Sequence, residues 1–149
     1  MKTLIIDSSV AAKWILPDEA DDPGSLRLLE DIRRHRVAVV VPDLFRSEIT
    51  SLVARSIRSG RLSGDRSEAL SHVESLGILF ASGAGVSPST IKVALEVNQS
   101  PYDCCYLALA IQLGCDLYTA DLRFIRSVRG AYTCVKDIAD YPSPSGDDR

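Results

Sequence analysis

The sequence predicts an α/β domain, a three-layer α/β/α sandwich around a central, mostly parallel sheet of four to five strands. Strand-like and helix-like segments alternate along the chain, which is typical of this architecture. The strand-like segments are continuous hydrophobic runs without polar alternation, as in parallel strands that helices cover on both faces. The 149 residues, of which 46% are hydrophobic, suit a single core. We therefore expect one domain over residues 1–140 and a flexible C-terminal tail over residues 141–149.

Four strands are expected where short runs of buried-type residues stand between turn signals. They cover residues 3–7, 37–41, 116–119 and 132–135. The first run ends on Asp7, and Asp121 follows the third run within two residues. Ligands of parallel α/β sheets bind beyond the carboxyl ends of the strands, so both carboxylates are expected at the edge where active sites form.

Seven helices are expected from apolar periodicity and from capping residues. They cover residues 10–16, 23–36, 43–60, 65–79, 88–97, 101–113 and 122–128. Ser8 and Ser9 offer N-caps to the first helix. Ser100 followed by Pro101 is a strong start for the sixth helix. Residues 104–111 of that helix are apolar on every face, so we expect it to lie inside the domain.

The charge balance is acidic, with 20 Asp and Glu against 17 Lys and Arg and a formal net charge of −3. A protein that holds nucleic acid mainly by neutralising phosphates is usually basic, so the balance argues against a simple nucleic-acid-binding module. Several arginines nevertheless cluster, and guanidinium forks suit phosphate oxygens. We select Arg55, Arg58 and Arg123 as candidate contacts to nucleic-acid phosphates. The alternative is that these arginines only solvate exposed helix faces.

The sequence also argues against membrane, secreted and zinc-binding proteins. Its apolar runs are shorter than the ~20 residues that span a bilayer. The chain reaches Asp7 too early for a signal peptide, so we expect a cytoplasmic protein without membrane contact. Its four cysteines and two histidines lack the close spacing of zinc ligands.

Four carboxylates are candidates for an active site: Asp7, Glu48, Asp103 and Asp121. Asp103 lies in the first turn of the predicted internal helix, and Glu48 borders the apolar stripe of the helix over residues 43–60. Each also has a structural alternative. Asp103 suits the helix dipole, Asp121 can cap the following helix, and Glu48 can reach water from the rim of the core.

Taken together, the four carboxylates favour a metal site. Two like charges about 4 Å apart repel by about 4 kcal/mol at an effective dielectric constant of about 20. A half-buried cluster of four therefore needs protons or a cation. Ligands that offer only oxygen favour hard cations, so we expect Mg²⁺ or Mn²⁺, which activates water and binds phosphoryl oxygens.

Four segments of the chain carry a resemblance to a known family. They are Leu-Ile-Ile-Asp7-Ser-Ser, Pro42-Asp-Leu-Phe-Arg-Ser-Glu48, Tyr102-Asp103-Cys-Cys-Tyr-Leu-Ala-Leu-Ala and Tyr118-Thr-Ala-Asp121-Leu-Arg-Phe. Together they resemble the PIN-domain family, and in particular the VapC-type toxins of bacterial type II toxin–antitoxin systems. The resemblance runs from Met1 to about Ile138 and keeps the four acids in the order of the family.

The resemblance implies a PIN-like fold and a Mg²⁺- or Mn²⁺-dependent endoribonuclease. By position, Asp7 and Asp103 would be the most direct metal ligands, and Glu48 and Asp121 would complete the site. The family commonly forms homodimers. Its cognate antitoxins insert a segment at the active site, often with an Arg among the acids.

The resemblance also assigns supporting roles. Ser8 and Thr119 match small hydroxyl positions that orient the carboxylates in the family. Asp116 precedes the last acid and could substitute for it, but we interpret it as a bystander. The paired Cys104 and Cys105 are unusual after the third acid, but both suit an internal helix.

Our hypothesis is the toxin component of a toxin–antitoxin module, which hydrolyses RNA phosphodiester bonds with a carboxylate-held divalent ion. One alternative is another Mg²⁺-dependent phosphoryl-transfer domain, such as a receiver-like module in which Thr119 and Lys136 would assist an acceptor acid. The other alternative is a catalytically silent protein that only binds its antitoxin.

Overall fold

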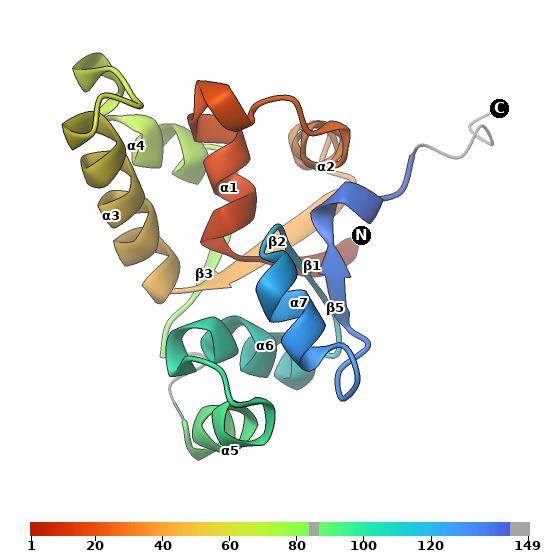
Figure 1. Cartoon of the computed structure of the whole chain (residues 1–149). Coiled ribbons are helices and arrows are strands. Elements are labelled where there is room, and N and C mark those ends of the chain that lie inside the picture. Colours follow the sequence, from red (N-terminus) through yellow and green to blue (C-terminus); the bar gives the residue numbers. More distant parts are fainter. Residues whose placement is uncertain (84–86, 144–149) are drawn as a thin grey trace, which may run out of the picture.

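A computed structural model of the chain describes residues 1–83 and 87–143. Its centre is a five-stranded sheet in the order β3-β2-β1-β4-β5, in which every neighbouring pair is parallel (Figure 1). The strands are β1 (Lys2–Ile6), β2 (Val37–Pro42), β3 (Leu79–Ala81), β4 (Asp116–Thr119) and β5 (Val135–Asp137). The predicted α/β fold around a parallel sheet is therefore confirmed. Part of the predicted tail, residues 144–149, lies outside the described residues.

Helices cover the sheet on both sides. They are α1 (Ser8–Ile15), α2 (Pro23–Arg33), α3 (Leu44–Arg58), α4 (Ala69–Glu74), α5 (Pro88–Val97), α6 (Pro101–Leu113) and α7 (Leu122–Val128). In Figure 1, α1 to α4 lie above the sheet and α5 and α6 lie below it. Within the described residues, no helix combines the length and the hydrophobicity needed to cross a membrane.

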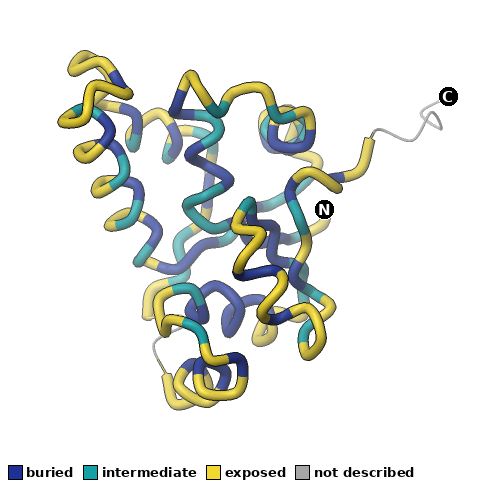
Figure 2. Tube along the Cα trace, viewed as in Figure 1, coloured by how far each residue is buried: buried dark blue, intermediate teal, exposed yellow. Residues whose placement is uncertain are grey.

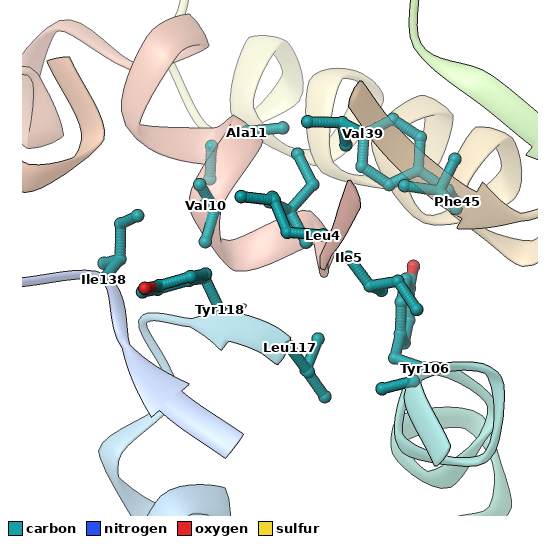
Figure 3. Packing of buried hydrophobic residues seen from close by; sticks show 14 of the residues in the cluster. Leu4, Ile5, Val10, Ala11, Val39, Phe45, Tyr106, Leu117, Tyr118 and Ile138 are labelled. Carbon is teal, nitrogen blue, oxygen red and sulfur yellow. The ribbon is translucent and has the colours of Figure 1, made fainter. Parts of the chain in front are cut away.

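The core lies on the central strands and on the helix faces that cover them. Figure 2 shows buried segments concentrated in the sheet and on the helix sides turned toward it. Leu4, Ile5 and Ile6 of β1 are at most 1% exposed, as expected of a strand covered on both faces. Figure 3 shows β1 side chains packed between α1 on one side and Tyr106 of α6 on the other.

Helix α6 is the internal helix that its sequence predicts. Residues 104–110 are all buried, and the helix packs against β1, β2 and β4. The prediction fails at Ile111, which is 44% exposed. The Ser100 hydroxyl accepts the Tyr102 amide at 3.1 Å, and Gly114 ends the helix in the left-handed region at φ 63°.

Four predicted helix boundaries are corrected by the structure. Helix α1 is capped by Asp7, whose carboxylate accepts the Ser9 amide, and not by Ser8 or Ser9. Helix α2 stops at Arg33, since His35 takes the left-handed φ of 55°. Helix α3 ends at Arg58 and not at Gly60, and at its start the Asp43 side chain makes no capping hydrogen bond.

The segment over residues 65–79 was expected to be one helix, which is wrong. The structure has a 3-10 turn at Gly64–Arg66, the short helix α4 and then strand β3. Gly77 breaks the helix at φ 82°, and β3 pairs with β2 through Leu79 opposite Val40. The fourth predicted strand was also misplaced, because pairing with β4 selects Val135–Asp137 as β5.

Candidate functional site

Asp7 occupies the junction between the central strand and the first helix. Strand β1 ends at Ile6 and α1 begins at Ser8, so Asp7 stands at the carboxyl edge of the sheet. Its Oδ1 accepts the Ser9 amide at 3.1 Å and the Ser9 hydroxyl, and its Oδ2 accepts the Thr119 hydroxyl. Burial and, to a smaller extent, the charge of Glu48 raise the pKa of Asp7 to about 6, although these hydrogen bonds act to lower it.

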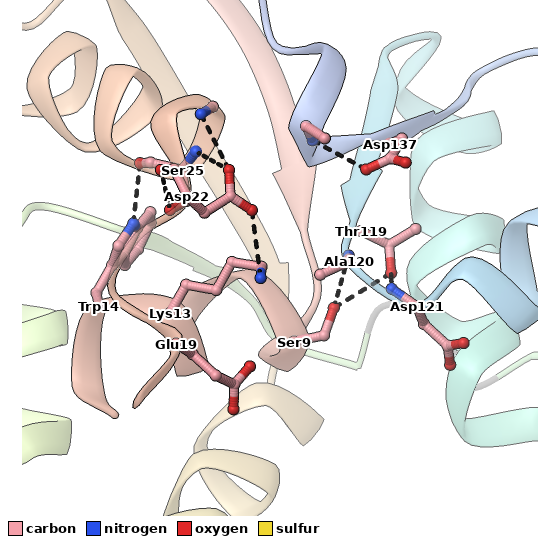
Figure 4. Close-up of polar contacts among 12 residues, drawn as sticks. Ser9, Lys13, Trp14, Glu19, Asp22, Ser25, Thr119, Ala120, Asp121 and Asp137 are labelled. Atoms are coloured by element: carbon pink, nitrogen blue, oxygen red, sulfur yellow. Dashed lines mark hydrogen bonds and ion pairs between the residues drawn. The ribbon is translucent and has the colours of Figure 1, made fainter. Parts of the chain in front are cut away.

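A network of hydroxyl groups joins the start of α1 to the end of β4 (Figure 4). The Ser9 hydroxyl accepts the Ala120 amide at 2.9 Å and lies 3.3 Å from the Thr119 hydroxyl. The Thr119 hydroxyl accepts the Asp121 amide at 3.0 Å, and Thr119 is fully buried. The network fixes Asp7 and the backbone of Asp121 relative to each other.

Asp121 also begins helix α7, the capping role weighed from the sequence. Its Oδ1 accepts the Phe124 amide at 3.0 Å. The cap fixes the direction of this exposed carboxylate at the rim of the site. Capping and a role in the site are therefore compatible for Asp121.

Glu48 reaches the site from helix α3 and is half-buried. Its Oε1 accepts the hydroxyl of Tyr106, and the Ser8 hydroxyl also bonds to its carboxylate. Burial raises the pKa of Glu48, and the charge of Asp103 raises it further. Ser8 therefore contacts Glu48, whereas Thr119 contacts Asp7.

Asp103 completes the row of acids from the first turn of α6. Burial and the charge of Asp121 raise its pKa. Each of these pKa shifts includes a neighbouring acid: Glu48 acts on Asp7, Asp103 on Glu48, and Asp121 on Asp103. The fold thus brings four acids from distant parts of the sequence to one edge of the sheet.

The acids neighbour one another in pairs and do not converge on a single point. Within residues 1–83 and 87–143, no three Asp, Glu, His or Cys side chains lie in an arrangement that could hold a metal ion as they stand. The donor set still suits a divalent cation, since it offers only carboxylate oxygens. Burial is the main cause of the raised pKa values of three of the acids, and repulsion by a neighbouring acid adds to it; a bound cation would offset both.

A cleft of about 290 Å³ opens beside Glu48, between α1 and α3. Its lining residues are Ser8, Ser9, Ala12, Glu48, Ser51, Leu52 and Arg55. Arg55 lies about two helical turns after Glu48 on α3, and both residues line this cleft. The described lining does not include Arg58 or Arg123, which are both exposed.

Asp116 lies away from the carboxyl edge. It is the first residue of β4, and its carboxylate lies 3.7 Å from Lys2 Nζ. The position agrees with its interpretation as a bystander.

Sequence reasoning missed Ser9 and Tyr106. Ser9 follows Asp7 by two residues, and the Asp-Ser-Ser pattern does not reveal which hydroxyl turns back onto the carboxylate. Tyr106 lies three residues after Asp103, within the apolar run of α6, and gives no polar signal of its own.

Fold and site define a class of protein, a parallel α/β domain with an all-carboxylate site at the carboxyl edge of its central strands. The chain belongs to the PIN domain family, whose model matches residues 4–129. PIN domains are generally nucleases and generally use divalent metal ions. The matched range contains all four acids.

Solved structures share this fold. The crystal structure of PAE2754 from Pyrobaculum aerophilum superposes with a TM-score of 0.66 at 20% identity, over 93% of this chain and 85% of that chain. VapBC2 from Rickettsia felis, bound to a DNA fragment from its promoter, gives a TM-score of 0.64 at 11% identity, over 91% and 98%. The structure of FitAB bound to the IR36 DNA fragment gives a TM-score of 0.64 at 15% identity, over 95% of this chain and 99% of that chain. No curated protein matches the sequence at a significant level.

Proposed function

We propose that this protein is a metal-dependent endoribonuclease, the toxin component of a toxin–antitoxin module. The observation that carries the proposal is the row of four acids at the carboxyl edge, in which each neighbouring pair repels, within a chain of the PIN domain family. Bound Mg²⁺ or Mn²⁺ would activate water for attack on phosphorus and neutralise phosphoryl oxygens. RNA is the proposed substrate, and the cytoplasm is the proposed location.

The residues of the chain take distinct roles in this proposal. Asp7 and Asp103 would be the direct ligands, while Glu48 and Asp121 would complete the site. Ser9 and Thr119 hold both oxygens of Asp7, so its carboxylate reaches the ion in one orientation. This restriction supports Asp7 as a fixed ligand.

Arginines would bind the RNA strand. Arg55 is the best placed of the three candidates, because it lines the cleft that also contains Glu48. A guanidinium there would contact a phosphate next to the one that is cleaved. Arg58 and Arg123 would provide weaker, solvent-screened attraction from outside the cleft.

The test is cleavage of RNA by the purified protein with Mg²⁺ or Mn²⁺. Asp7→Asn and Asp103→Asn are each expected to abolish cleavage, whereas Asp116→Asn serves as the matched control and should retain it. EDTA should stop the reaction. Cleavage that survives EDTA and both site substitutions would remove this mechanism.

We propose a protein antitoxin as the physiological partner. Two of the solved structures with this fold, VapBC2 and FitAB, carry the names of two-component assemblies. A cationic segment would be attracted to the four acids for the same electrostatic reason as a metal ion. Growth arrest on induced expression, relieved by co-expression of the adjacent small open reading frame, would support the toxin role over that of a silent binding protein.

We also propose a homodimer, on the basis of an apolar surface over α5 and α6. Ile91, Leu95 and Tyr102 are 60%, 78% and 67% exposed there, beside an apolar groove of about 550 Å³. Leu95→Lys is expected to shift the mass in light scattering from dimer to monomer. Leu26→Lys, at a 48% exposed position on α2, is the control and should leave the dimer intact.

A further inference from the structure

Tyr106 links the buried core to the candidate site. It lies in the middle of α6 and is only 2% exposed, yet its hydroxyl donates a hydrogen bond to Glu48 Oε1 on α3. The two residues are 58 positions apart in the sequence. Figure 3 shows the ring beside Ile5 of β1, with the hydroxyl oxygen at the end turned away from α6.

The packing around Tyr106 makes its hydroxyl a fixed point. Helix α6 packs against β1 and β2, and the Tyr106 ring belongs to the main hydrophobic core. A close-packed ring has few accessible rotamers. Glu48, in contrast, is half-buried on α3 and has three side-chain torsions, so its carboxylate needs an external contact to stay in one orientation.

The direction of this hydrogen bond follows from the two groups. A tyrosine hydroxyl carries the proton and donates, and the carboxylate oxygen Oε1 of Glu48 accepts.

We propose that Tyr106 is a positioning residue, whose hydroxyl engages one oxygen of Glu48 and leaves the other oxygen oriented for a divalent ion. The inference rests on the proposed function, in which Glu48 belongs to the metal site. Partners that orient metal-binding carboxylates typically change affinity by about 10- to 100-fold when they are removed. Tyr106 would act at the low end of this range, because the Ser8 hydroxyl also holds Glu48.

The experiment measures binding of Mn²⁺ alone to the full chain, by calorimetry and by electron paramagnetic resonance. Tyr106→Phe removes one oxygen atom and is expected to weaken Mn²⁺ binding by about 10-fold. Tyr141→Phe is the matched control. It removes another buried tyrosine hydroxyl that donates to a carboxylate, that of Asp31, outside the site, so affinity should stay within about twofold of wild type.

A double-mutant cycle separates positioning from a general loss of structure. In a Glu48→Gln background, Tyr106→Phe is expected to cause no further loss of Mn²⁺ affinity, because its effect runs through the missing carboxylate. Additive losses would assign Tyr106 a structural role and overturn the inference. So would wild-type affinity in Tyr106→Phe, or loss of its cooperative thermal unfolding.

The same data distinguish this inference from the proposed function. If Glu48→Gln weakens Mn²⁺ binding and Tyr106→Phe does not, only the role of Tyr106 fails. If the wild-type protein binds no Mn²⁺ at millimolar concentration, the proposed metal site fails and the role of Tyr106 fails with it.

Discussion

Asp7→Asn is expected to make the metal-free protein more stable near neutral pH, although it removes a proposed catalytic group. Burial raises the pKa of Asp7 from 3.8 to about 6, so ionised Asp7 destabilises the folded state. Asparagine has the same shape and cannot ionise. Its Oδ1 can still accept the Ser9 amide that caps α1.

The sign and size of this effect follow from proton linkage. Folded Asp7 keeps its proton up to about pH 6, whereas the unfolded chain releases it near 3.8. The folded state therefore binds more protons between these values, and the free energy of unfolding falls as the pH rises through them. A gap of about 2 pH units corresponds to about 3 kcal/mol. This is an upper limit, since Asp7 keeps some contact with water that screens its charge.

We expect the free energy of unfolding of Asp7→Asn to exceed that of wild type by about 1–3 kcal/mol at pH 7.5, and by about 1 kcal/mol or less at pH 4.5. Urea unfolding in EDTA at both pH values measures the difference. Asp116→Asn is the control, because it removes a carboxylate away from the site and should show no such pH-dependent gain. An Asp7→Asn protein that is less stable than wild type at pH 7.5, or whose advantage does not change with pH, would refute the reasoning.

Three further predictions concern the hydroxyl network, a close backbone approach and the cleft. Thr119→Val should lower the free energy of unfolding in urea by about 1–3 kcal/mol, because it removes the hydroxyl that bonds the Asp7 carboxylate and the Asp121 amide. Thr119→Ser keeps a hydroxyl and should lower it less; equal losses would contradict this role. Gly24→Ala should lower the free energy of unfolding by about 1–3 kcal/mol or more, because its Cβ would lie 2.0 Å from a carbonyl oxygen of the turn Ile138–Asp140. The control is Gly64→Ala, whose Cβ would lie in open space and which should leave the thermal melt unchanged. Arg55→Ala should weaken RNA binding and reduce the slope of log affinity against log salt by about 0.7–1, and Arg58→Ala should do so less; equal effects would remove the special place of the cleft.

The sequence alone determined the elements that carry strong local signals. Continuous apolar runs located β1, β2 and β4, and the Ser-Pro start with a glycine stop gave α6 its observed bounds. Strands β3 and β5 were missed or misplaced because each has only three residues at the edge of the sheet. Such short strands are selected by pairing with a neighbour, which no local pattern encodes.

The candidate site shows the same division between local signals and tertiary contacts. Its four acids could be named from the sequence, because strand ends, a helix start and the order of the PIN family each leave a local signature. Their partners could not: Thr119 meets Asp7 across 112 positions, and Tyr106 meets Glu48 across 58. Local sequence fixes where a carboxylate begins or ends an element, whereas its donors and its burial depend on which distant segments the packed core places beside it. The tertiary structure alone therefore decided the orientation and the raised pKa values of these acids.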